Sequence, residues 1–126
     1  MISNELAFET LKPILDKLNS GKLNEAYSMS SQLVLKFPKS AILFNLIGAC
    51  YSGLSNHFDA IESYKKAIEN NPEYAYSYYN LGNELKSLEM LDDAINNYKK
   101  AIEINPSYVN AYNNFGNAYN DLGNID

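Results

Sequence analysis

The sequence predicts an all-α protein built as a solenoid, a stack of antiparallel helix pairs. Three observations lead to this prediction. Blocks of sequence recur 34 residues apart, apolar residues within each block have helical spacing, and a proline follows the second predicted helix of each full block. A repeat of this length is typical of supersecondary units that cannot bury their apolar faces alone and therefore stack.

The recurrence is clearest in the second half of each unit. Residues 60–74 return as residues 94–108, with the run Tyr-Lys-Lys-Ala-Ile-Glu unchanged in both copies. The first halves share an aromatic residue, then an apolar residue three positions later and then glycine, in copies that include Gly48, Gly82 and Gly116. Glycine inside a helix costs about 1 kcal/mol of propensity, so these repeated glycines indicate close packing.

An earlier unit, at residues 7–40, is degenerate, as a terminal cap of a stacked array is expected to be. It keeps four residues in phase with the later units: Gly21, Leu23, Ala26 and Pro38. Four others replace the expected aromatic, aliphatic and small residues: Thr10, Pro13, Lys17 and Ser30.

Each unit predicts two helices that face each other. In residues 75–108, one helical stripe of apolar and small residues is followed by a second stripe that begins at Leu91. Prolines end the second helices, because the residue before a proline is displaced from the helical region. Ser40 is placed to cap the next helix. The predicted helices span residues 4–19, 23–36, 41–53, 57–70, 75–88, 91–104 and 109–122.

A single domain over residues 1–126 is expected, because no linker rich in proline, glycine or serine divides the chain. The register predicts repeats at about residues 7–40, 41–74 and 75–108 and a half repeat at 109–126. Because the sequence stops in the turn before a second helix is due, we expect a fragment of a longer array, with an apolar seam of Tyr112, Phe115 and Tyr119 left uncovered. In the alternative, helix 109–122 is a terminal cap with a polar face.

The order of aromatic, Leu-Gly, aromatic, alanine, aromatic, alanine and proline in this frame resembles the tetratricopeptide repeat (TPR) family. The resemblance covers roughly residues 7–126. It implies a right-handed superhelix whose first helices line a concave groove for a peptide or a partner protein. The runs 80–83 and 114–117 are most similar to the arrays of O-linked GlcNAc transferase-like proteins and of sulfotransferases. In the glycosyltransferase arrays, an asparagine ladder matching Asn80 and Asn114 holds the backbone of the substrate peptide.

Composition restricts the partners. The formal net charge is -5 and the chain has no arginine, which argues against a nucleic-acid ligand. Residues 40–54 are the most apolar stretch, but they are too few to span a bilayer and Asn45 interrupts them. The first ten residues are acidic rather than basic and apolar, so no secretory signal is predicted and a cytoplasmic location follows by default. The lone Cys50 fits a reducing compartment.

The sequence predicts no enzyme, no cofactor and no metal site. His57 is the only histidine, and we interpret it as a solvent-facing residue that opens a helix. Cys50 follows Gly48 in an apolar helix and is interpreted as a small buried hydrophobe. Asp92 and Asp93 begin a helix, where carboxylates stabilise the helix dipole, and adjacent residues project in different directions.

The candidate binding site is the set of groove-facing residues that lie off the apolar stripes. Asparagine offers both a donor and an acceptor, so a row of asparagines can pair with the main chain of an extended ligand. Leu46 interrupts the row in the unit at 41–74. No cation other than Lys86 lies near these positions, so a clamp for a terminal carboxylate is not expected. The predicted peptide-binding residues are Asn45, Tyr76, Tyr79, Asn80, Asn83, Asn110, Asn113, Asn114 and Asn117.

The sequence therefore predicts a non-catalytic module that binds an extended peptide or protein segment. Two alternatives stay open. The array recruits substrates for a transferase domain in a longer protein, or it is a scaffold that self-assembles through helix 109–122. The asparagines would then keep the groove soluble without contacting a peptide.

Overall fold

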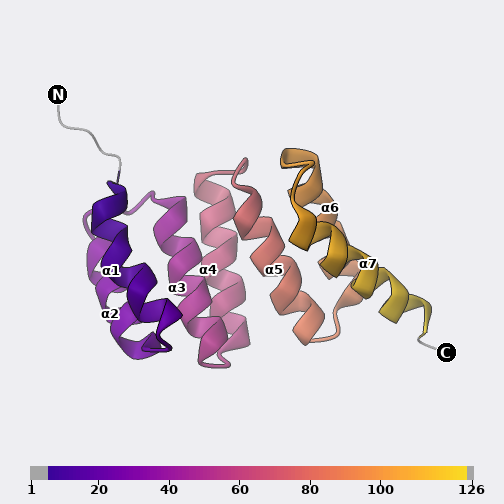
Figure 1. The fold of residues 1–126 in the computed structure, drawn as a ribbon, viewed down its shortest axis with the longest axis horizontal. Helices are drawn as coiled ribbons and strands as arrows, with labels where there is room; N and C mark the ends of the chain where they lie inside the picture. The colour runs from indigo at the N-terminus through magenta and orange to yellow at the C-terminus, as the bar shows by residue number, and fades with distance from the viewer. Residues whose placement is uncertain (1–5, 125–126) are drawn as a thin grey trace.

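The computed structural model describes residues 6–124 and is all-α, which confirms the predicted fold class. Within these residues every regular element is an α-helix (Figure 1). The helices are α1 (Phe8–Asn19), α2 (Leu23–Val34), α3 (Ala41–Gly53), α4 (His57–Asn70), α5 (Ala75–Ser87), α6 (Leu91–Ile104) and α7 (Val109–Gly123).

The helices form three consecutive antiparallel pairs, followed by α7. Figure 1 shows α1, α3, α5 and α7 in a front layer and the second helices of the pairs behind them. Neighbouring first helices touch, α3 against α5 and α5 against α7, and each second helix packs against both the helix before it and the helix after it. The front layer therefore carries equivalent repeat positions side by side.

The helix bounds agree with the predicted ones to within one residue except at two ends. α1 begins at Phe8, because Ala7 has an extended backbone, while the predicted residues 4 and 5 lie outside the described range. α2 ends at Val34, two residues early, because the N–H groups of Lys36 and Phe37 both turn back to the carbonyl of Leu33. The cap predicted at Ser40 is confirmed, since its Oγ accepts a hydrogen bond from the N–H of Leu43 at 3.2 Å.

The turn inside each pair repeats the same backbone geometry. Gly21, Ser55 and Glu89 stand one repeat apart, and all three have positive φ, of 75°, 62° and 60°. The N–H of the next residue then donates to a carbonyl five positions earlier, as Met90 does to Leu85 at 2.9 Å. This arrangement satisfies the free carbonyls at the helix end. Glycine favours this conformation in the first turn only, so serine and glutamate carry a local strain in the other two.

Glycine in the first helix of a pair lies under a tyrosine ring from the second helix. A Cβ added at Gly48 would lie 2.5 Å from Cε1 of Tyr64, and one added at Gly82 would lie 2.7 Å from Cε1 of Tyr98. We call these two contacts the glycine seats. They confirm the predicted close packing, and they show that an aromatic ring, rather than a facing backbone, requires the missing side chain.

In the first helix pair, the large and the small residue of the seat are exchanged between the two helices. Ile14 occupies the repeat position of Gly48, and Ser30 occupies that of Tyr64. Both side chains are fully buried, and the Ser30 hydroxyl donates to the carbonyl of Ala26 at 2.8 Å. The large side chain thus comes from the first helix and the small one from the second. The degenerate unit keeps a packed core by this exchange of volumes.

Gly116 on α7 occupies the equivalent repeat position, but no tyrosine ring lies over it. Nothing lies within 4 Å of a Cβ added at Gly116. Tyr112 and Tyr119 on the same helix are 46% and 62% exposed. Among the described residues no second helix follows α7. The expected seam is therefore uncovered at Tyr112 and Tyr119, whereas Phe115 is half-buried against the core.

The two environments give opposite predictions for one substitution. Gly82→Ala should lower the free energy of unfolding by about 1–3 kcal/mol, because the methyl group forces the Tyr98 ring to move. Gly116→Ala should leave stability unchanged or raise it by up to about 1 kcal/mol, because the methyl group meets open space and alanine favours the helix. Urea unfolding followed by circular dichroism measures both. Equal effects of the two substitutions would show that the seat does not constrain the packing.

Candidate functional site: an amide surface on α5 and α7

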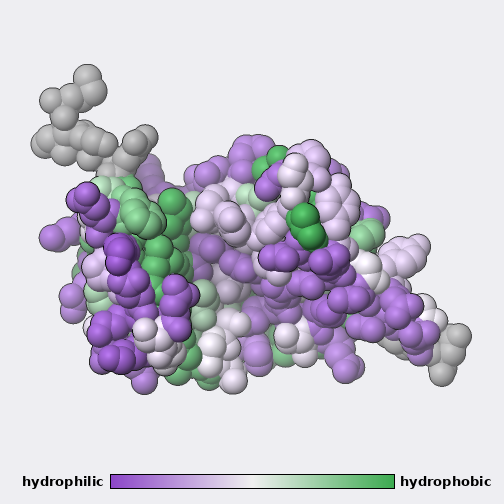
Figure 2. All heavy atoms as spheres, in the orientation of Figure 1, coloured by the Kyte–Doolittle hydropathy of each residue, from purple (hydrophilic) through white to green (hydrophobic). Residues whose placement is uncertain are grey.

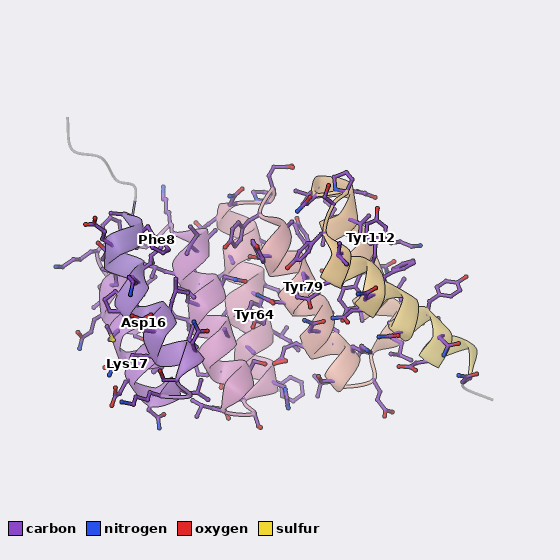
Figure 3. The ribbon with its side chains drawn as sticks, in the orientation of Figure 1. Phe8, Asp16, Lys17, Tyr64, Tyr79 and Tyr112 are labelled. Carbon is purple, nitrogen blue, oxygen red and sulfur yellow. The ribbon has the colours of Figure 1, made fainter. Side chains whose placement is uncertain are left out.

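The predicted site residues lie on three helices of the front layer. Asn45 on α3 is buried, whereas Tyr79, Asn80, Asn83 and Asn114 are half-buried. The exposed members are Tyr76, Asn110, Asn113 and Asn117. Figure 3 places Tyr79 between α5 and α7, and Figure 2 shows that the face over these two helices is mainly hydrophilic. We call the predicted residues of α5 and α7 the amide surface.

Asn83 joins three helices. Its Oδ1 accepts a hydrogen bond from the Tyr98 hydroxyl of α6 at 2.6 Å and another from Nδ2 of Asn114 on α7 at 2.8 Å. Nδ2 of Asn114 also donates to the Tyr79 hydroxyl at 3.1 Å. Because Tyr98 is held in its glycine seat, its hydroxyl fixes the position of the Asn83 amide, and Asn83 in turn orients Asn114.

A second pair of amides connects α3 to α5. Nδ2 of Asn80 donates to Oδ1 of Asn45 at 3.1 Å. Asn45 is 8% exposed, so it supports the surface from below and is not available as an open ligand contact. Asn80 and Asn114 both bridge neighbouring repeats, so we expect them to contribute to stability as well as to the surface.

The hydrogen bonds inside the protein leave a defined set of free groups. Both N–H groups of the Asn114 amide are used, which leaves its carbonyl oxygen. Asn83 accepts through its oxygen and keeps both N–H groups. Asn80 keeps one N–H and its oxygen. The surface therefore presents both donors and acceptors, on amides that neighbouring side chains hold in place.

A tyrosine cluster borders the amides at the start of α5 and α7. The ring of Tyr108 lies 4.8 Å from that of Tyr79 and 5.3 Å from that of Tyr76, centroid to centroid, and Tyr74 lies 5.6 Å from Tyr76. Burial raises the pKa of Tyr74 and of Tyr108, so both hydroxyls stay uncharged near neutrality. Tyr74 and Tyr108 were absent from the predicted site, although their recurrence in phase was a signal for them.

One polar pair between a half-buried histidine and a buried glutamate was also missed. His57 opens α4 as predicted, but its Nδ1 lies 3.4 Å from Oε1 of Glu84, whose side chain is 3% exposed. Leu91 and Ala118 occupy the same two positions one repeat later, and both belong to the apolar core. Burial raises the pKa of the neighbouring Tyr64, and the Glu84 carboxylate raises it further. The pair is thus a polar substitution in one inter-repeat contact, outside the amide surface.

The remaining reactive side chains are packed as the sequence predicted. Cys50 is fully buried, and burial raises the pKa of its thiol to about 11, which disfavours the nucleophilic thiolate. Asp92 and Asp93 lie in the first turn of α6. Over residues 6–124 no group of three or more His, Cys, Asp and Glu side chains is placed to hold a metal ion. None of the helices in this range combines the length and the apolar character needed to cross a membrane.

Comparison with known sequences identifies the repeats. Residues 56–88 and 82–123, together more than half of the chain, match the family model described as TPR repeat. The chain is 39% identical over 66 residues to the small glutamine-rich tetratricopeptide repeat-containing protein of Dictyostelium discoideum. That match covers 52% of this chain and 20% of the relative, so most of the relative lies outside the match.

Comparison with solved structures also finds TPR domains. The first TPR domain of Spaghetti (RPAP3) superposes with a TM-score of 0.87 at 20% identity, covering 97% of both chains. MamA superposes with a TM-score of 0.82 at 31% identity, covering 90% of this chain and 67% of that one. The first likeness shows the fold, a TPR superhelix of three helix pairs and a further helix. The family match over residues 56–123 shows that the chain belongs to the TPR repeat family.

Proposed function

We propose that the chain is a non-catalytic interaction module that binds an extended peptide or protein segment across the amide surface. The observation that carries this proposal is the Asn83 junction, which holds amides of α5 and α7 in fixed directions while leaving donors and acceptors free. Groups fixed before binding lose little conformational entropy when a ligand arrives. This preorganisation favours a binding role over mere solubility.

Main-chain recognition suits this surface better than recognition of charge. The free amide groups match the N–H and C=O groups that alternate along an extended peptide. The exposed Tyr76 adds a rigid apolar contact that also carries a polar hydroxyl. Lys86 is half-buried and forms no ion pair with residues 6–124, and the amide surface itself contains no cation. A carboxylate clamp on this surface is therefore not part of the proposal.

The structural relatives suggest a ligand class. The first TPR domain of RPAP3 is bound to the HSP90 peptide SRMEEVD, and the second to the HSP70 peptide SGPTIEEVD. Both ligands are short acidic peptides. We propose that this chain also accepts an acidic extended peptide, held mainly by its backbone on the amide surface. A cytoplasmic partner fits the unpaired, buried Cys50.

A transferase array is the second candidate. The runs 80–83 and 114–117, similar to those of O-linked GlcNAc transferase-like proteins, favour it, because the same amides would then present a substrate peptide to a catalytic domain elsewhere in a longer chain. The full reading frame of the gene distinguishes the two. If a transferase domain is encoded downstream, the array is a substrate-binding part of an enzyme. If none is encoded, the transferase candidate has no support.

Self-association through α7 is the third candidate, favoured by the open seat at Gly116 and by the exposure of Tyr112 and Tyr119. A helix from a second copy would cover this seam. Light scattering over a range of protein concentrations separates this candidate from the others, because a monomer at every concentration would leave the seam unused by a second copy.

Backbone recognition predicts that peptide binding depends on main-chain N–H groups. Labelled SRMEEVD should bind, and a version N-methylated at alternate residues should bind about tenfold more weakly or worse, because each lost hydrogen bond is worth roughly 0.5–1.5 kcal/mol. Fluorescence anisotropy measures both affinities. Equal binding of the methylated and unmethylated peptides would contradict the proposal.

Substitutions on the protein complete this test. Asn80→Ala with Asn114→Ala should weaken the same peptide by about tenfold or more. Because these amides also bridge repeats, the pair should cost about 1–3 kcal/mol of stability, so binding is measured where both proteins are fully folded. Asn96→Ala, an exposed position on α6, is the matched control and should change neither quantity by more than about 0.5 kcal/mol.

A further inference from the structure

A second concave site lies away from the amide surface, where the α2–α3 connection meets the end of α4. It is a hollow open to solvent, with a volume of about 850 Å³. We call it the loop pocket. Its lining residues are Leu6, Lys36, Phe37, Pro38, Lys39, Ser40, Ala41, Ile42, Asn70 and Asn71. Figure 2 shows hydrophobic atoms gathered between α1 and α3 on the front face, in contrast to the hydrophilic face over α5 and α7.

The lining of the loop pocket combines apolar groups with positive charge. Half of its residues are apolar, including Phe37 and Ile42, and Ile42 is 38% exposed. Lys36 and Lys39 are exposed, and neither forms an ion pair with any residue of 6–124. No carboxylate is among the described residues that line the pocket. Two lysines without an ion partner among residues 6–124 therefore line a partly apolar hollow.

Helix α3 takes part in both the loop pocket and the support of the amide surface. Ile42 lines the pocket, and Asn45, three residues further along α3, accepts the hydrogen bond from Asn80 of the amide surface. Residues three apart on a helix lie on the same face. The loop pocket therefore lies at the start of the helix that supports the amide surface from below, although Asn45 itself is buried.

We propose that the loop pocket is a side-chain-selective subsite, which takes an aliphatic residue flanked by acidic residues from the same peptide that the amide surface holds. This inference rests on the proposed function for the rest of the peptide. Charge complementarity determines the occupant: Lys36 and Lys39 pair with the acidic side chains, while Phe37 and Ile42 contact the aliphatic one. The amide surface supplies affinity for the backbone, and the loop pocket supplies selectivity for the sequence.

Short fragments test the subsite without the amide surface. Acetyl-Leu-Glu-Glu-amide and acetyl-Leu-Gln-Gln-amide have the same size and differ in charge. In an NMR titration of the protein, the acidic fragment should shift the signals of Phe37 and Ile42, with at least about threefold tighter binding than the neutral fragment. Lys36→Gln with Lys39→Gln should abolish that difference. Lys99→Gln with Lys100→Gln, exposed on α6 and equal in charge change, should preserve it.

The outcomes separate this inference from the proposed function. Equal binding of both fragments, shifts at residues remote from the loop pocket, or an equal response to sodium acetate alone would overturn the subsite, and the last result would reduce it to a site for simple anions. The N-methylated peptide tests the amide surface independently. If that test fails while the fragments still differ, the loop pocket is a separate site and the shared-peptide proposal is wrong.

Discussion

The tyrosine ring of a second helix, lying over a glycine of the first, is the contact on which the rest of the structure depends. Tyr64 over Gly48 and Tyr98 over Gly82 set how closely the two helices of a pair approach. In the third pair the seat also determines the site, because the Tyr98 hydroxyl reaches Oδ1 of Asn83. Packing and recognition are thus linked through one side chain.

The residue beside the seat differs between the two halves of the front layer. Ala49 occupies, in the second pair, the position that Asn83 occupies in the third, so Tyr64 has no amide to orient. Near α1 and α3 the face is apolar, with lysines at its edge, and over α5 and α7 it is rich in amides (Figure 2). A single extended ligand that crosses both halves would meet side-chain selection first and backbone pairing second.

Most of the fold could be predicted from the sequence, because period and apolar spacing determine the helices locally. The cap at Ser40 and the interior glycines were predicted for the same reason. The positive φ at Ser55 and Glu89 could not be predicted, because neither residue type favours that conformation. The repeated turn geometry imposes it. The exchange of volumes between Ile14 and Ser30 was not predicted either. Each residue considered alone looks like a departure from the repeat pattern, and only the pair shows the compensation.

The candidate site was predictable as a set of positions but not as a network. Helical spacing places Asn80, Asn83 and Asn114 on one layer, yet it gives no information on which amides meet across repeats. The Glu84 carboxylate escaped for a related reason. Its burial depends on α4, and the one local signal was that Cys50 and Ala118 fill the same repeat position.

The central claim is that the packing seat of Tyr98 holds the binding amides in place. Tyr98→Phe keeps the ring over Gly82 and removes only the hydroxyl, so stability should fall by about 1 kcal/mol while affinity for labelled SRMEEVD falls about fivefold or more. Tyr64→Phe is the matched control, because the structure shows no hydrogen bond from its hydroxyl to the amide surface. The decisive quantity is the ratio of the two affinities. An equal affinity for both variants would contradict the claim.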